Sequence, residues 1–313
     1  MSSSTALVID ASCDLPKSFL DSHELIILPT RVKHGDKDFV DIRDMKSTLG
    51  FYRNVLQKNK DVRLEPANAD VIAAIVKAKI INKFDAVRVI SPHSDWSEIH
   101  KNVKDAAFIN NDNFKSWREA AGLDPKFRLR VLDSGSFFSG QGLLVYEAVR
   151  LLKEKALSVD KMKKPLELFK SHIDTYVVMD NVSYLRAYEK FEAGSMGWFD
   201  FGVGKVLGQK PAIRCYQNEV SMAFRERGYD ATLAKVLERA KEHIDDGLER
   251  PVVNISYAGN LAEIRSNVEF TKFVKHAKSQ HVKILLSMAS TSAGAIAGPK
   301  AFSISYAYEE YVS

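Results

Sequence analysis

The stretch Leu129-Arg130-Val131-Leu132-Asp133-Ser134-Gly135-Ser136-Phe137-Phe138-Ser139-Gly140-Gln141-Gly142-Leu143 decides the fold. Its first four residues predict a short buried strand, which ends at a loop of small hydroxyl residues and glycine. The apolar run that begins near Leu143 predicts a long helix directly after this loop. A strand, a polar loop and a helix in this order are typical of a parallel α/β sheet, whose ligands bind at the carboxyl ends of the strands.

Two other stretches of the N-terminal half have the same order. A strand at residues 6–9 is followed by Asp10 and Ser12, and a strand at residues 85–90 is followed by the polar run 91–98. In a doubly wound sheet these strand ends lie side by side, so we expect the three loops to line one crevice. Helix capping is the simpler reading of their hydroxyl groups, since each cap stabilises a helix by ~1 kcal/mol. Each loop, however, has more hydroxyl groups than one cap requires.

The rest of the chain changes character at about residue 160. Before that point strands and helices alternate, with a strand over 25–32 broken at Pro29, a helix over 42–58 and a loop at 63–68 in which Asn68 or Asp70 caps the next helix. After it, the pattern is α+β with antiparallel pieces: helices over 162–173, 183–190, 232–246 and 260–278, and strands over 176–180, 212–216, 219–223, 252–257, 282–288 and 301–308. We therefore predict an N-terminal α/β domain over 1–159 and a C-terminal α+β domain over 160–313, with the last strand, 301–308, packing with either one.

Composition restricts the class of protein. The 313 residues are 45% hydrophobic and 27% charged, and 45 basic against 40 acidic residues give a net charge of +5 that is spread along the chain. This distribution predicts a soluble globular protein with no nucleic acid partner. The polar start of the chain does not resemble a signal peptide, and no run approaches the ~18 apolar residues of a membrane span. With Cys13 and Cys215 read as free thiols, we expect a cytoplasmic protein with no integral membrane association.

Metal, nucleotide and nucleophile motifs are not found. The eight histidines do not form a ligand pattern, and the sequence contains no phosphate-binding Gly-x-x-x-x-Gly-Lys-Ser/Thr loop. Ser134 follows a strand, but no Gly-x-Ser-x-Gly elbow surrounds it and no base is evident. We expect no metal site, no cofactor and no catalytic residue. An enzyme on a related α/β fold that acts on a small anionic substrate is the alternative.

The order of several short motifs resembles the DegV family. They are Leu7-Val-Ile-Asp10-Ala-Ser-Cys-Asp14-Leu-Pro16, Ile27-Leu-Pro29, Phe39-Val-Asp41, Leu132-Asp133-Ser134, Ser139-Gly-Gln-Gly142, Tyr184-Leu185, Lys210-Pro211-Ala-Ile and Gly298-Pro299-Lys-Ala-Phe-Ser-Ile-Ser-Tyr. The resemblance covers nearly the whole chain, and it implies a two-domain α/β fold that encloses one long-chain fatty acid between the domains. It also implies that the protein can present the bound acid to a separate fatty acid kinase subunit, which phosphorylates the carboxyl group.

This chain departs from the family at the loops that would hold the carboxyl group. Arg63 replaces a threonine, and the loop from Ser91 to Ser97 keeps only the first serine of the family pattern. A Gly-Gly-Arg motif is absent, with Lys190 or Ser195 nearest to the position of its arginine, and Ile296-Ala297 replaces His-Thr. The acyl chain would supply most of the affinity, because ~14 buried methylenes at ~0.8 kcal/mol exceed a head-group bond of ~1.5–3 kcal/mol.

The sequence therefore predicts a lipid-binding protein without catalytic residues. We expect Arg63, Ser91, His93 and Ser94 to bind the head group, with Lys190 as a further cationic contact. Residues expected to shape the same crevice are Asp10, Ser12, Asp133, Ser134, Gly298 and Pro299. Arg63 can equally be a solvated residue paired with Glu65 or Asp61. In a third alternative, an interaction protein, the aromatic residues between Trp198 and Phe201 would fill the crevice.

Overall fold

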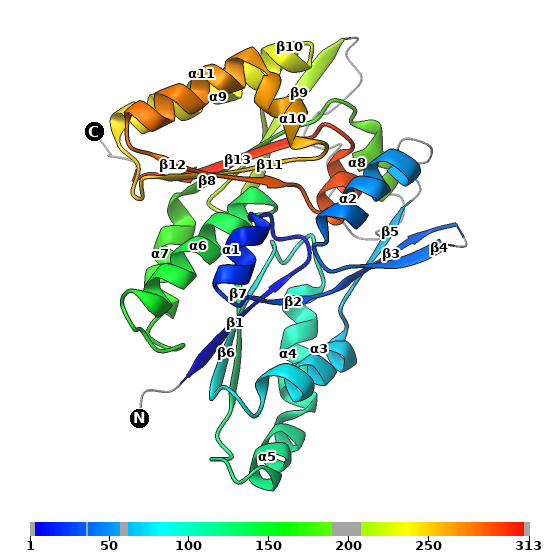
Figure 1. Ribbon diagram of the computed structural model, residues 1–313, viewed down its shortest axis with the longest axis vertical. Coiled ribbons are helices and arrows are strands. Elements are labelled where there is room, and N and C mark those ends of the chain that lie inside the picture. Colours follow the sequence, from blue (N-terminus) through cyan, green and yellow to red (C-terminus); the bar gives the residue numbers. More distant parts are fainter. Residues whose placement is uncertain (1–3, 36, 57–61, 190–207, 310–313) are drawn as a thin grey trace.

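The computed structural model describes residues 4–35, 37–56, 62–189 and 208–309, which form stacked layers of helix and sheet (Figure 1). A six-stranded sheet and a four-stranded parallel sheet lie on either side of one central helix, and further helices cover their outer faces. A three-stranded antiparallel sheet stands beside these layers. The mixed α/β class predicted from the sequence, with a parallel sheet first and an α+β part after it, is confirmed.

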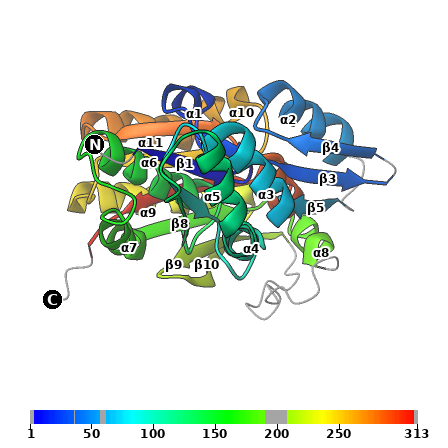
Figure 2. The same cartoon turned by 90° about the horizontal axis from the view of Figure 1, so that it is seen from below.

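The four strands of the parallel sheet all fall in stretches that the sequence predicts as strands. Its strands, in spatial order, are β2 (Ile26–Leu28), β1 (Thr5–Asp10), β6 (Ala86–Ser91) and β7 (Arg128–Asp133), all parallel. Every residue of β1 and β6 is buried, as expected for strands covered on both faces. Helices α3 (Ala69–Ile75), α4 (Ile99–Ile109) and α5 (Asn111–Ala120) lie on one face (Figure 2). Asn68 caps α3 by accepting a hydrogen bond from the Val71 N–H at 3.0 Å.

The long helix predicted from near Leu143 begins four residues earlier, as α6 (Ser139–Lys153), and is the centre of the molecule. It contacts β1 and β6 on one side and three strands of the six-stranded sheet on the other, and 11 of its 15 residues are buried. Helices α1 (Lys17–Ser22) and α7 (Lys163–His172) pack into the same core. Gly142 explains the close packing at its start, because a Cβ there would lie 2.3 Å from the Asp14 carbonyl oxygen and 2.4 Å from Asn254 Nδ2.

The six-stranded sheet belongs to the C-terminal half. Its strands, in spatial order, are β10 (Glu219–Arg227), β9 (Gln209–Tyr216), β8 (Ile173–Val178), β13 (Phe302–Ala307), β11 (Val252–Tyr257) and β12 (Lys283–Met288). The last strand of the chain, β13, therefore pairs with β8 and β11. Helix α9 (Tyr229–Asp246) lies on the outer face of this sheet with α10 (Leu261–Ser266) and α11 (Val268–Ser279). The predicted hairpin is confirmed, and its turn residues Gln217 and Asn218 both have positive φ.

The three-stranded sheet corrects one prediction. It consists of β4 (Lys37–Asp41), β3 (Thr30–His34) and β5 (Arg63–Pro66), so residues 63–66 are a strand and not a loop. The stretch pairs antiparallel with β3 as an edge strand, where a proline is tolerated at the end. Pro29 separates β2 from β3, so a single predicted strand over 25–32 contributes to two sheets.

Two predicted helices also differ from the structure. The helix predicted over 42–58 begins three residues later, as α2 (Met45–Phe51) followed by the π-helical turn Tyr52–Leu56, because Arg43 has a φ of +65° and Asp44 caps the helix. The helix predicted over 260–278 is two helices, α10 and α11. Asn267 lies between them in an extended conformation and caps α11 by accepting from the Phe270 N–H at 3.1 Å. The remaining elements are the π-helical turn Val76–Ile80, α8 (Ser183–Glu189) and α12 (Thr291–Ala297).

Candidate ligand-binding site

A cavity of about 820 Å³ lies at the carboxyl ends of the parallel strands. Asp10 and Ser12 line it from the loop after β1, and Phe137 and Phe138 from the loop after β7. Its other walls come from the loop after β6, the three-stranded sheet, α3, α4, α8 and α12. The residues from those walls are Pro29, Thr30, Arg31, Val40, Leu64, Glu65, Pro66, Ala67, Asn68, Val71, Pro92, His93, Ser94, Asp95, Trp96, Ser97, Glu98, Lys101, Tyr188, Ser292 and Ile296. Exposed and buried side chains both contribute, so the cavity opens to the surface.

Asp10 and Ser12 are held in one hydrogen-bond arrangement beside α6. Asp10 Oδ2 accepts from the Ser12 backbone N–H at 2.9 Å and from the Ser12 hydroxyl at 2.5 Å, while Asp10 Oδ1 accepts from Gln141 Nε2 at 2.7 Å. Burial raises the pKa of the Asp10 carboxyl, and the hydrogen bonds from Gln141 and Ser12 oppose this rise. Both carboxylate oxygens are thus occupied by the protein, which fixes the loop after β1.

The loop after β6 brings His93 and Ser94 to the cavity. His93 is buried, its Nδ1 accepts from the Asp95 N–H at 3.2 Å, and its Nε2 lies 3.0 Å from the Asn218 carbonyl oxygen. A neutral ring with its proton on Nε2 satisfies both contacts. The ring stacks on Trp96, whose centroid is 5.0 Å away. His93 therefore forms part of the wall and connects it to the hairpin of β9 and β10, while the side chain of Ser94 is exposed.

Ser91, Asp133 and Ser134 do not line the cavity; they support the loops that do. Ser91 is fully buried, and its hydroxyl lies 3.4 Å from both the Leu132 carbonyl oxygen and His100 Nδ1. Asp133 accepts from the Ser94 N–H at 3.2 Å and from the Gly135 N–H at 2.8 Å. Ser134 is buried and donates to the Ser136 carbonyl oxygen at 2.9 Å. These hydroxyl and carboxylate groups hold turns together, as the capping interpretation anticipates.

Three other sequence-predicted residues, Arg63, Gly298 and Pro299, are not among the residues that line the cavity. Arg63 is exposed on β5, where its register partner is Lys33, and the Glu65 carboxylate pairs with Lys33 Nζ at 2.6 Å. Gly298 ends α12 with a φ of +84° and packs against Tyr184, where a Cβ would lie 2.6 Å from the ring. Pro299 follows it in the turn before β13. Lys190, Ser195 and the aromatic residues between 198 and 201 lie outside the described residues.

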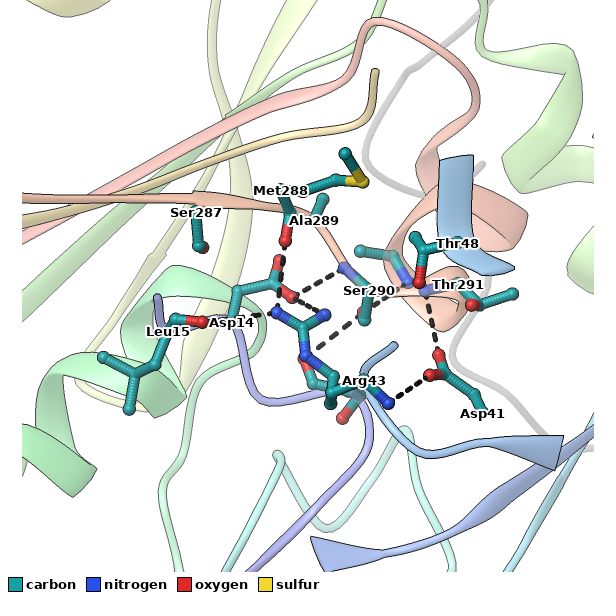
Figure 3. A network of polar contacts seen from close by, with 12 residues as sticks. Asp14, Leu15, Asp41, Arg43, Thr48, Ser287, Met288, Ala289, Ser290 and Thr291 are labelled. Atoms are coloured by element: carbon teal, nitrogen blue, oxygen red, sulfur yellow. Dashed lines mark hydrogen bonds and ion pairs between the residues drawn. The ribbon is translucent and has the colours of Figure 1, made fainter. Parts of the chain in front are cut away.

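A buried ion pair fixes α12 against the loop after β1 (Figure 3). Arg43 Nη1 donates to Asp14 Oδ1 at 3.1 Å, and Arg43 Nη2 donates to the Met288 carbonyl oxygen at 3.1 Å. Asp14 Oδ1 also accepts from the Ser290 N–H at 2.8 Å, so the carboxylate binds the residue that precedes α12. Asp41 connects the same pieces, since it accepts from the Arg43 N–H at 2.8 Å and from the Thr291 N–H at 3.0 Å.

The family resemblance pointed to Ile296 of α12, but sequence reasoning missed Ser292 of the same helix and the aromatic wall. Ser292 and Ile296 of α12 line the cavity, as do Phe137 and Phe138. The run Met288-Ala289-Ser290-Thr291-Ser292 is a fourth strand end with hydroxyl residues before a helix, so the pattern used for the other three loops could have found Ser292. The aromatic pair had no such signal, because its position depends on how the loop after β7 turns, with Phe138 at a φ of +52°.

The charged groups at the cavity are mainly acidic. Asp10, Glu65, Asp95 and Glu98 contribute carboxylates, whereas the two lining cations, Arg31 and Lys101, are exposed. Arg31 Nη1 pairs with Asp38 at 3.3 Å and Lys101 Nζ with Asp105 at 3.8 Å. Among the lining residues that the structure describes, none is a buried cation, so none of these residues would neutralise a buried anionic group.

The candidate metal cluster and the two cysteines do not line the cavity. Within the described ranges, one set of side chains, His172, Glu249 and Glu309, has ligand atoms within 4.8 Å of one another. Its His172 Nδ1 is already 2.8 Å from Glu249 Oε2, and the Glu249 carboxylate also lies 3.7 Å from Arg250 Nη2, so Glu249 already has two partners in the protein. Cys13 and Cys215 are free and buried, and burial raises the pKa of the Cys215 thiol to about 12.

Comparison with known proteins decides the family. The sequence model of the DegV family, described as "Uncharacterised protein, DegV family", matches residues 4–309. This chain belongs to the DegV family. A DegV domain-containing protein of Xanthomonas axonopodis pv. citri is 28% identical over 307 residues, which cover 97% of this chain and 98% of that protein.

Solved DegV structures share the fold. DegV of Bacillus subtilis, described as a fatty acid binding protein, aligns with a TM-score of 0.77 at 20% identity and covers 98% of this chain and 100% of its own. A stearic acid-binding protein of Eubacterium ventriosum aligns with a TM-score of 0.77 at 19% identity over 97% of this chain and 98% of its own. The DegV fold predicted from the motif order is therefore confirmed. Among the helices that the structure describes, none has the length and apolar character to cross a membrane.

Proposed function

We propose that this DegV-family chain is a lipid-binding protein that holds a long-chain fatty acid or a similar acyl ligand in the cavity at the carboxyl ends of the parallel strands. The observation that carries the proposal is the cavity itself: its volume of about 820 Å³ falls in the ~300–1,000 Å³ range of ligand sites. Its walls combine Leu64, Phe137, Phe138 and Ile296 with a few hydroxyl groups. The solved relatives from Eubacterium ventriosum and Bacillus subtilis, which are described as fatty acid-binding proteins, support the same assignment.

The electrostatics favour this proposal over its alternative. An enzyme for a small anionic substrate would need positive charge in the crevice, whereas among the described lining residues the buried ionisable groups are Asp10 and His93, and the cations Arg31 and Lys101 are exposed. An apolar tail needs no such charge, because ~0.8 kcal/mol per buried methylene accumulates along the chain. We therefore assign to this chain a binding role in the cytoplasm, without a catalysed reaction of its own.

The proposal includes the head-group contacts that the sequence predicts. His93 and Ser94 lie at the cavity and stay proposed head-group contacts, with Asp10 and Ser12 beside them. For Arg63, Ser91 and Lys190 the role stays a prediction from the sequence. The separate kinase that the family resemblance implies also stays a prediction, and its test is ATP-dependent formation of an acyl phosphate by a candidate kinase only when the loaded protein is present.

The test of lipid binding is native mass spectrometry of the delipidated protein offered hexadecanoic acid. We expect one bound acid per chain. Ile296→Asp places a carboxylate on the apolar wall and should weaken binding at least ~10-fold, because burying a charge beside an acyl chain costs several kcal/mol. Ile109→Asp is the matched control, since Ile109 is an exposed isoleucine on α4. The proposal is contradicted if the measured mass stays that of the ligand-free chain when hexadecanoic acid, and then other acyl ligands, are offered.

A further inference from the structure

We infer that the acyl ligand binds with an uncharged head group that both donates and accepts a hydrogen bond, and that the Ser292 hydroxyl is the donor from the protein. The inference rests on the proposed function and narrows it. The ligand class is a protonated carboxylic acid or a primary alcohol on an acyl chain, and not an ionised carboxylate.

The first observation concerns Ser292. This residue lies in the first turn of α12, is 3% exposed and lines the cavity, yet its Oγ has no hydrogen-bond partner among the described residues. A buried hydroxyl without a partner costs ~1–3 kcal/mol. A rotation of the Ser292 side chain about χ1 would turn this hydroxyl into the cavity, where an oxygen atom of a ligand would accept its proton and remove the cost.

The second observation concerns the direction of the hydrogen bonds at Ser12. Its hydroxyl donates to Asp10 Oδ2 at 2.5 Å, and the other Asp10 oxygen accepts from Gln141, so the proton of Ser12 is committed within the protein. Ser12 Oγ therefore presents lone pairs to the cavity. A head group that meets both serines must donate one hydrogen bond and accept another, whereas an ionised carboxylate can only accept.

The third observation is the charge around this end of the cavity. Asp10 is buried beside Ser12, and a like charge brought into contact with it disfavours ionisation of both groups. The exposed cations Arg31 and Lys101 are already paired with Asp38 and Asp105. Binding the neutral form of the ligand avoids an unpaired buried anion altogether.

Isothermal titration calorimetry of the full chain with dodecanoic acid and 1-dodecanol from pH 5 to 8.5 tests the inference. Above the pKa of the free acid, about 4 to 5, only a falling fraction of the acid is neutral, so its Kd should rise ~10-fold per pH unit. The Kd of the alcohol should change less than ~2-fold. The alcohol reports any titration of the groups that face the cavity: Asp10 of β1, Arg31 of β3, Glu65 of β5, His93, Asp95, Glu98 and Lys101 of the β6 loop and α4, and Tyr188 of α8.

Two serine variants test whether the Ser292 hydroxyl is the hydrogen-bond donor to the ligand. Ser292→Ala should weaken binding of both ligands about 5-fold, the loss of one neutral hydrogen bond. Its free energy of unfolding should be no lower than that of the wild type, because the deleted hydroxyl has no protein partner. Ser22→Ala, which removes an exposed hydroxyl from the end of α1, should leave both Kd values unchanged.

The outcomes separate the two levels of the proposal. Binding of neither ligand overturns the proposed function, and the inference with it. Tight binding of the acid that does not weaken with pH, or binding of the acid without the alcohol, leaves the function standing and overturns the neutral head group. Unchanged affinity of Ser292→Ala for both ligands overturns the assignment of the donor.

Discussion

Asp14 and Arg43 show how one pair of residues controls the position of the site. The carboxylate and the guanidinium are both buried, and together they hold the residue before α12 and the end of β12. Burial raises the pKa of Asp14, and the charge of Arg43 opposes that rise, so the pair exists at a cost of desolvation. Such a pair tolerates the loss of one partner poorly, because the other charge is left buried and alone.

Replacing Asp14 with Asn should therefore lower the free energy of unfolding by ~3–5 kcal/mol, measured by urea denaturation at pH 7. Asp21→Asn is the control, because Asp21 pairs with Lys17 on the exposed surface of α1 and its loss should cost under ~0.5 kcal/mol. Equal decreases in the free energy of unfolding of the two variants would show that the buried pair stabilises the fold no more than the exposed pair does.

Individual site residues were predictable only where the local pattern determines them. Asp10, Ser12, His93 and Ser94 follow strands that their own sequence defines, and all four line the cavity. The family motif predicts Arg63 as a head-group contact. Its side chain lies on an edge strand whose existence depends on pairing with β3. That pairing is a contact between segments about 30 residues apart, so no short window of sequence contains it.

At the scale of elements, α6 determines how closely the two large sheets approach. Its first turns carry Gly140 and Gly142, whose missing side chains let backbone and polar groups from β8, β11 and the loop after β1 come into contact with the helix. Asn254 of β11 uses this proximity to donate to the Asp14 and Ser139 carbonyl oxygens at 2.8 and 2.7 Å. The long apolar helix was predictable from its sequence, but its position between two sheets depends on the fold of the second half.

Gly142→Ala should be strongly destabilising, by ~3 kcal/mol or more in the free energy of unfolding, because the new methyl group would lie 2.3 Å from a backbone oxygen that cannot move alone. Gly50→Ala gives the matched control. Gly50 is also in a helix, α2, with nothing within 4 Å of an added Cβ, so this change should be neutral or stabilise by up to ~1 kcal/mol. Chemical denaturation of both variants measures the difference, and a Gly142→Ala protein as stable as the wild type would contradict the close packing.

At the scale of the whole molecule, α6 connects the two halves of the chain in one core. Its apolar residues Leu143, Leu144, Ala148 and Leu151 belong to the same buried cluster as residues of the N-terminal strands and as Ile173, Val252, Leu285 and Ala307 of the six-stranded sheet. A change in the order of elements predicts a domain boundary near residue 160. The division into two domains stays a prediction. A change in element order does not show whether each part can bury its own apolar surface.

The packing of α6 gives a definite expectation for the isolated halves. A fragment of residues 1–159 would expose the face of α6 that contacts β8, β11 and β13, while residues 160–313 would expose the matching face of the sheet. Because exposed apolar area costs ~25 cal/mol per Å², the fragment 1–159 should show no cooperative urea transition by circular dichroism, and the full chain should unfold in a single transition. Mixing the two fragments should restore part of the native signal. A fragment 1–159 that unfolds cooperatively alone would instead establish it as an independent domain, with α6 stabilised by the parallel sheet and not by its contact with the second half.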